Sequence, residues 1–181
     1  MISKVVAFHS RECWDSEQWV VPVQRERMYK DFEGWGDSVK SILSLMKKTD
    51  VWALFKHPPC ESYFESRVCL LGDAAHASTP HMGAGAGMAI EDAYVLSNLL
   101  GEILGVNELE NAFRAYDLTR RPRSQQLVEW SSQQGQLYDL ELVGDDPIQV
   151  SKELATRTRW VWEHDLEKNL SEAKRLVGVQ L

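Results

Sequence analysis

The pattern of apolar and polar residues predicts a chain that begins with strands and continues mainly in helices. Residues 5–8 and 19–21 are apolar, β-rich runs that suit neighbouring strands of an antiparallel sheet, and residues 51–56 show strand character again. Between these runs, residues 39–46 carry apolar side chains at helical spacing. We therefore expect a small sheet and a short helix in the first third of the chain.

A strand of another kind is expected over residues 67–73, "RVCLLGD". Val68 to Leu71 are apolar without alternation, as in a parallel strand that is covered on both faces, and the strand ends at Asp73. A stretch rich in glycine and alanine follows and passes, from about Gly85, into a helix with apolar residues on several sides. We expect this helix to be buried.

Further helices are expected over the rest of the chain. Apolar residues repeat at helical spacing between residues 109 and 137, and Pro122 within this run should kink or divide the helix. After a loop at residues 143–147, a last helical region carries an apolar stripe that predicts docking on the body of the protein. The stripe consists of Trp162, Leu166, Leu170 and Ala173.

Charge and composition argue against several classes of protein. The formal net charge of −7 disfavours a nucleic-acid-binding surface, which needs clustered Lys and Arg. The one basic cluster, Arg120, Arg121 and Arg123, is interpreted either as a solvated face or as a set of partners for acidic side chains and helix carbonyls. No run reaches the roughly 18 apolar residues of a membrane span, and cysteines without CxxC spacing suit reduced thiols. We expect a cytoplasmic protein with no membrane or nucleic-acid partner.

The corner after residue 72 combines two devices that can bind a ligand. Asp73 places a carboxylate at the end of a strand, where it can accept hydrogen bonds from hydroxyl groups of a ligand. Gly83, Gly85 and Gly87 lead into a helix whose first N–H groups are not obstructed by Cβ atoms. The spacing is not the GxGxxG of a pyrophosphate loop. The pair suits a flat ligand with hydroxyls at one end and an electron-rich carbonyl at the other.

Other polar residues of this corner allow more than one interpretation. Asp73, His76 and His81 could form a metal site of a hydrolase, but the loop offers no established ligand spacing, and we predict no metal. His76 is expected to brace the loop, while His81 either faces a substrate or is simply exposed. Glu91 is expected to stabilise the start of the helix, and for Asp92 the same role and a functional one stay open.

These residues carry a resemblance to a known family. "RVCLLGDAAHASTPHMGAGAGMAIEDA" resembles the second flavin-binding motif of the FAD-dependent aromatic hydroxylases, the group A flavoprotein monooxygenases similar to salicylate hydroxylase. "DFEGW", "VWALFKHPP" and "AFRAYDLTRRPR" agree with the family more loosely. The positions that match the motif are Gly72, Asp73, Ala74, Ala75, His76, Pro80, Gly83, Gly85, Glu91, Asp92 and Ala93.

The resemblance implies a role for most residues of the glycine-rich corner. Asp73 would bind the ribityl chain of FAD, Pro80 would lie beside the isoalloxazine ring, and backbone N–H groups at the helix start would face its pyrimidine edge. A helix N-terminus at that edge stabilises the negative charge of reduced flavin. The implied cofactor-binding residues are Asp73, Pro80, Gly83, Gly85, Ala86 and Gly87, and the implied substrate-side residues are Trp52, Phe55 and His81.

The resemblance also implies a fold and an activity. The expected fold is α/β, a partial FAD/NAD(P)-binding monooxygenase fold with a remnant antiparallel substrate sheet and a helical C-terminal region. The expected parts are a remnant sheet and helix at residues 1–66, the flavin-facing strand and helices at 67–142, and a helical tail at 143–181. With FAD, NAD(P)H and O₂, the protein would hydroxylate a phenolic or polyketide-like aromatic small molecule.

The match covers only the C-terminal portion of such hydroxylases, because the sequence lacks the N-terminal GxGxxG region that holds the ADP half of FAD. Two readings therefore stay open. In one, a homodimer or a complementing chain covers the exposed sheet. In the other, a shortened homologue without flavin catalyses a non-redox isomerisation or cyclisation, or serves as a binding protein.

Overall fold

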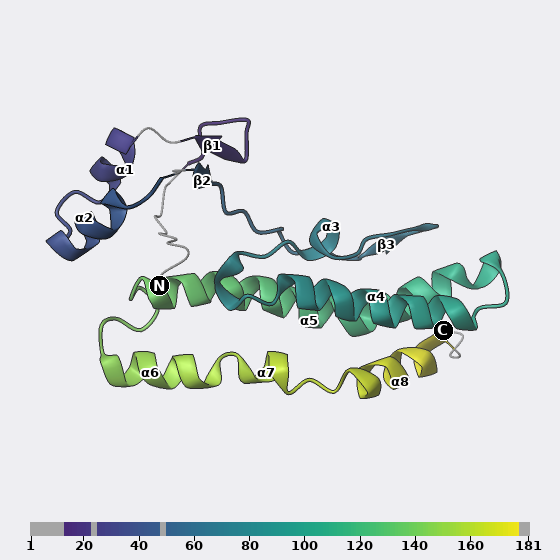
Figure 1. Ribbon diagram of the computed structural model, residues 1–181. Coiled ribbons are helices and arrows are strands. Elements are labelled where there is room, and N and C mark those ends of the chain that lie inside the picture. The colour runs from purple at the N-terminus through teal and green to yellow at the C-terminus, as the bar shows by residue number, and fades with distance from the viewer. Residues whose placement is uncertain (1–12, 23–24, 48–49, 178–181) are drawn as a thin grey trace. The chain divides into compact units, whose positions relative to one another are not determined.

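The computed structural model describes residues 13–22, 25–47 and 50–177, and the chain forms two compact units, Met1–Leu54 and Phe55–Leu181 (Figure 1). The expected strand at residues 5–8 lies outside the described residues. The boundary that the sequence suggested at residue 66 falls within the second unit.

The described residues of the first unit form a two-stranded antiparallel sheet and two short helices. Strand β1 (Val20–Pro22) pairs with β2 (Asp50–Trp52), and helices α1 (Arg25–Asp31) and α2 (Asp37–Ser44) lie between them in the sequence. The predicted helix is thus confirmed. The strand expected over residues 51–56 ends at Trp52, because the chain beyond it makes no further ladder with β1 in the described part.

The second unit contains one small hairpin and a set of helices. The hairpin pairs β3 (Phe64–Glu65) with β4 (Val68–Cys69) in antiparallel register. The helices that follow are α3 (Asp73–His76), the 3₁₀ turn η1 (Pro80–Met82), α4 (Gly85–Glu102), the 3₁₀ turn η2 (Val106–Glu108), α5 (Leu109–Tyr138), α6 (Pro147–Thr156), α7 (Arg159–Trp162) and α8 (Leu166–Val177).

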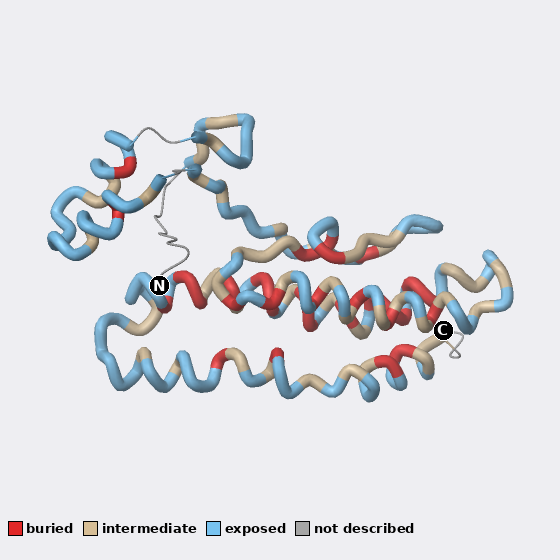
Figure 2. The backbone as a smooth tube through the Cα atoms, viewed as in Figure 1, coloured by how far each residue is buried: buried red, intermediate tan, exposed pale blue. Residues whose placement is uncertain are grey.

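The core of the second unit lies where α4, α5 and α8 pack against one another. Figure 2 shows buried positions concentrated along α4 and α5. A first apolar cluster joins α4, α5, α8 and the hairpin, and includes Tyr63, Val95, Leu99, Tyr116 and Leu170. A second cluster joins η1 and the start of α4 to α5 and α7, and it consists of Met82, Ala84, Met88, Leu127 and Val161. The second cluster places the glycine-rich corner directly on α5.

The strand predicted as parallel is antiparallel instead. The described residues supply no parallel neighbour for β4, so its one partner is β3, the other arm of the hairpin. The side chain of Val68 is consequently exposed rather than covered on both faces. Cys69 packs against the first cluster, and burial raises the pKa of its thiol to about 11.

The helix predictions need three corrections. Helix α5 continues through Pro122, so the expected division is wrong, whereas a kink stays a prediction; the ring removes only one hydrogen bond, and flanking side chains hold the helix on both sides. In α4 the buried face contains Met88, Asp92, Val95 and Leu99, whereas Ile90 is exposed. In the last region Leu170 and Ala173 are buried as expected, but Trp162 is exposed.

Candidate functional site

One face of the glycine-rich corner is open to solvent. Asp73, Pro80, Gly83, Ala86 and Gly87 are all exposed, and Gly85 is half-buried. A Cβ atom added at Gly83 or Gly87 would meet no other atom within 4 Å. Five of the six predicted cofactor-binding residues thus lie on a bare, accessible surface.

The start of α4 lies at the centre of this open face. Ala84 precedes the helix and supplies no side-chain cap, and the N–H of Met88 is the donor to its carbonyl, at 2.9 Å. The N–H groups of Gly85, Ala86 and Gly87 lie ahead of that bond, at the positive end of the helix dipole. An electron-rich group of a ligand can therefore approach donors that no side chain covers.

Two glycines and a serine fix the path of the corner. Gly72 turns the chain from β4 into α3 at a φ of +61°, where a Cβ would lie 3.2 Å from the Cβ of Ala89. Gly83 ends η1 at a φ of +62°. Ser131 of α5 accepts a hydrogen bond from the N–H of Met82 at 3.2 Å and donates to the carbonyl of Thr79 at 2.5 Å. Helix α5 thereby holds η1 in place.

The opposite face of the same segment is buried and charged. His76, at the end of α3, is buried and its Nε2 bonds the carboxylate of Asp92 on α4. The other oxygen of Asp92 accepts from Nε of Arg120 on α5, at 2.8 Å. His76 therefore braces the loop as predicted, and Asp92 has a buried partner on each side instead of a role at the helix start.

Glu91 belongs to the same network. Arg123 donates to both of its oxygens, at 2.8 and 2.9 Å, and Nη2 of Arg120 donates at 2.7 Å. Burial alone would raise the pKa of Glu91, but the hydrogen bonds from Arg123 and the charge of Arg120 outweigh it and the pKa is lowered. Glu91 is thus fixed by two arginines, which overrides the simpler role expected from its place near the helix start.

The basic cluster is therefore not a solvated face. Arg120 is fully buried and Arg123 is nearly so, and each pairs with acidic side chains of α4. Arg123 also donates to the carbonyls of Trp160 and Val161 on α7, as the alternative interpretation of pairing and carbonyl capping expected. Arg121 pairs with Asp117 one turn earlier in α5.

His81 lies against α5 rather than simply in solvent. A Cβ added at Gly135 would lie 2.9 Å from Cε1 and 3.0 Å from Nδ1 of the His81 ring. The ring of Tyr138 lies 6.4 Å away, between centroids. Sequence reasoning missed Gly135, although a glycine inside a long helix was a signal of a close contact.

The predicted substrate-side residues fall in different units. Trp52, in β2, is exposed and belongs to the first unit, whereas Phe55 is the first residue of the second unit and His81 lies further along it. Their shared role at a substrate face stays a prediction.

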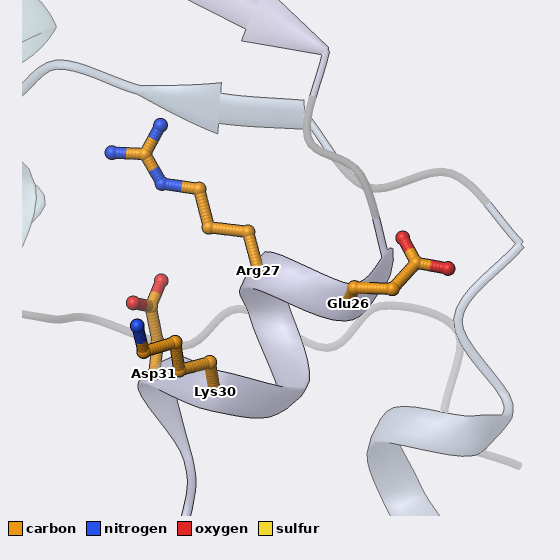
Figure 3. A pocket seen from close by; sticks show the side chains of 4 residues that line it. All are labelled: Glu26, Arg27, Lys30 and Asp31. Atoms are coloured by element: carbon orange, nitrogen blue, oxygen red, sulfur yellow. The ribbon is translucent and has the colours of Figure 1, made fainter.

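Neither the metal hypothesis nor the hollow on α1 defines another site in the described part of the chain. His76 is turned toward Asp92, and in the part of the chain that the structure describes no three His, Cys, Asp or Glu side chains converge on a metal position. Figure 3 shows a hollow lined by Glu26, Arg27, Lys30 and Asp31. These side chains all come from α1 and consist of two acidic and two basic residues, which is typical of a solvated helix face.

An uncapped helix start that carries only glycine and alanine, beside an exposed carboxylate and above a buried ionic network, suits the approach of a flat, partly anionic group. A family model described as "FAD binding domain" matches residues 22–131. The chain belongs to this family.

The chain is similar to several proteins of known activity. It is 39% identical to a salicylate hydroxylase of Pseudomonas putida, over 98% of this chain and 43% of that one. It is 36% identical to 6-methylsalicylate 1-monooxygenase atA of Aspergillus terreus, over 90% of this chain and 37% of that one. This chain thus spans less than half the length of these relatives.

A solved structure supports the same relationship. The structure described as "Salicylate hydroxylase substrate complex" superposes with a TM-score of 0.83 at 36% identity, covering 90% of this chain and 41% of that chain. The predicted monooxygenase fold is confirmed by this similarity.

No described helix is long and apolar enough to cross a membrane.

Proposed function

We propose that this protein is a FAD-dependent monooxygenase that hydroxylates a phenolic or polyketide-like aromatic compound with NAD(P)H and O₂. The observation that carries the proposal is the bare, exposed face around the start of α4, formed by Gly83, Ala86 and Gly87 beside Asp73. The relatives support it, because those named above are a salicylate hydroxylase and a 6-methylsalicylate monooxygenase.

The described residues fit the isoalloxazine and ribityl portions of FAD. A planar ring can approach Gly83 and Gly87 closely because an added Cβ there would meet nothing, so the space above them is open. The uncapped N–H groups suit the electron-rich pyrimidine edge of such a ring. The exposed carboxylate of Asp73 can accept hydrogen bonds from ribityl hydroxyls.

The chemistry that FAD supplies when bound is the transfer of electrons from NAD(P)H to O₂ and of one oxygen atom to the aromatic ring. The chain itself binds and orients. The dipole of α4 favours negative charge at its N-terminus without any rearrangement, since the helix is already fixed by its buried ion pairs. Pro80, exposed beside the helix start, would exclude water from one side of the ring, and His81 would stand at the substrate side.

The first experiment is a titration of the purified chain with FAD, followed by quenching of flavin fluorescence. We expect binding that Asp73→Ala weakens by about tenfold, the equivalent of one hydrogen bond to a charged group. Asp145→Ala, which removes another exposed carboxylate, is the matched control and should leave the affinity unchanged. A colourless protein that leaves flavin fluorescence unchanged would contradict the proposal and favour the alternative of a shortened protein that works without flavin.

The second experiment measures turnover. Salicylate and 6-methylsalicylate are offered with FAD and either NADH or NADPH, and both nucleotide oxidation and hydroxylated product are measured. We expect product formation coupled to nucleotide oxidation. We also propose that a second copy or a complementing chain covers the exposed sheet. Sedimentation of the chain should then show an assembly larger than a monomer, and a strictly monomeric chain would refute that partner.

A further inference from the structure

The buried network beneath the glycine-rich corner connects that corner to the C-terminal helices. Asp92 bonds His76 of α3 on one side and Arg120 of α5 on the other, and Nη1 of Arg120 donates to Oδ1 of Asn169 on α8 at 3.2 Å. We propose that Asp92 is a positioning residue for the flavin-facing segment. The proposal rests on the function proposed above, because it assigns to Asp92 the task of holding Asp73 where the flavin needs it.

The geometry of α3 explains how Asp92 can act at a distance. Helix α3 has only four residues, with Asp73 at its start and His76 at its end. A helix this short has little stability of its own, so its orientation depends on what holds its ends. The imidazole of His76 is its buried polar anchor, and the bond to Asp92 fixes it. Fixing His76 therefore fixes the carboxylate of Asp73 on the open face.

Arg120 holds Asp92 in a single orientation. Its guanidinium is fully buried and donates to Asp92, Glu91 and Asn169. A buried carboxylate between an arginine and an imidazole has little freedom to rotate, because each of its oxygens is already bonded. The C-terminal helix α8 thereby contributes to the site through Asn169, without reaching the open face.

The positioning role of Asp92 can be tested through the ring nitrogen of His76 that carries the proton. Both oxygens of Asp92 accept hydrogen bonds, so Nε2 of His76 carries a proton and donates it, while Nδ1 has no partner among the described residues. Asparagine at position 92 can offer only one acceptor, and its amide N–H₂ must face either Arg120 or His76. Arg120 cannot give up a proton, so His76 must move its proton from Nε2 to Nδ1 or lose the contact.

The first part of the test needs no flavin. Asp92→Asn is compared with Asp117→Asn, which alters another buried carboxylate that accepts from an arginine, Arg121, and from the backbone N–H of Tyr63, and that makes no bond to His76. We expect amide hydrogen exchange in residues 73–77 to rise about tenfold in Asp92→Asn only, as for the loss of one hydrogen bond to a charged group. The imidazole ¹⁵N signals of His76 should report the tautomer change. Equal exchange in both variants would overturn the proposal.

The second part separates positioning from stability. In the double variant Asp92→Asn with Asn169→Asp, Arg120 regains a carboxylate from α8, but His76 does not. We expect the double variant to recover stability while its flavin affinity stays about tenfold below that of the unmodified chain. If flavin affinity returns together with stability, Asp92 acts only by stabilising the fold and the proposal is wrong. If the unmodified chain binds no flavin at all, the proposed function fails, and the exchange data alone decide whether Asp92 positions α3.

Discussion

The two faces of the segment from Asp73 to Asp92 use the same stretch of sequence in opposite ways. The open face contains Gly83, Ala86 and Gly87, with nothing of the chain above the two glycines. The buried face contains His76 and Asp92, which are among the most deeply buried side chains of the protein. The open face thus carries small side chains around the helix start, whereas the buried face concentrates charge.

Four glycines of the second unit show the same contrast when the space around an added Cβ atom is compared. A Cβ at Gly72 or Gly135 would press on Ala89 or His81, so these two glycines are needed for internal packing. At Gly83 and Gly87 internal packing imposes no such limit, so the small side chains there leave room for something that is not part of the chain. The comparison indicates that the buried face serves stability, while the open face is left accessible for the binding that we propose.

The largest expected effect comes from removing the cation at the centre of the buried face. Arg120→Met leaves Asp92 and the partly buried Glu91 without a shared partner, and breaking a buried pair in this way costs about 3–5 kcal/mol. Denaturation with urea, followed by tryptophan fluorescence and far-UV circular dichroism, measures the loss.

The neighbouring Arg121 provides the control. Its side chain is 26% exposed and it pairs with Asp117 along the same helix, so Arg121→Met should cost no more than about 1 kcal/mol. If the two variants lose similar amounts of unfolding free energy, burial of the ionic network does not increase its contribution to stability. The buried face would then not be more important for stability than an exposed ion pair.

The sequence predicted the open face better than the buried one. Glycine, alanine and proline are conspicuous in "STPHMGAGAG", and the resemblance to flavin hydroxylases placed Asp73 and Pro80 at once. The buried network could not be found this way, because Arg120 and Asp92 are 28 residues apart and meet only when α4 packs on α5. Short-range patterns report local structure, whereas a pairing between helices depends on their packing.

Two errors in the fold have related causes. The run Val68 to Leu71 has the composition of a covered parallel strand, but a strand is parallel only if a parallel neighbour exists, and the described chain offers β3 instead. Pro122 was expected to kink or divide a helix, and the division does not occur, since Arg120 and Arg123 anchor α5 to α4 on both sides of it. In each case tertiary contacts outweighed a local preference.

A smaller effect is expected where the loop meets α5. Gly135→Ala improves helix propensity but forces a methyl group into the ring of His81, and overpacking of this kind costs about 1–3 kcal/mol. We expect a net loss of stability that His81→Ala largely reverses in the double variant, measured by thermal unfolding of all three proteins. If the changes in stability from Gly135→Ala and His81→Ala simply add, the imidazole ring moves aside freely. His81 is then not held against α5.

On the open face the same substitution should have the opposite sign. Gly87→Ala and Gly101→Ala both add a methyl group to α4 where an added Cβ meets nothing within 4 Å. Each should stabilise the chain by up to about 1 kcal/mol through helix propensity. Flavin affinity should fall only in Gly87→Ala, because that methyl group occupies the proposed ring site. Equal flavin affinities in the two variants would show that the flavin does not bind at the open face.

The smallest expected effect is a dependence of stability on pH that originates on the buried side. His164 lies between α7 and α8, and burial, followed by the charge of Arg123, lowers its pKa; Arg120 acts in the same direction, while Glu91 and Asp165 oppose it. Because the folded state resists protonation more than the unfolded state, this group costs nothing well above the ordinary histidine pKa of about 6.5 and destabilises the fold as the pH falls below it. Unfolding free energies measured between pH 8 and pH 5 should therefore decline less steeply in His164→Gln than in the unmodified chain, with the two slopes equal above pH 7. An unchanged slope would mean that water reaches His164 and screens it from the arginines, so that His164 does not belong to the buried face.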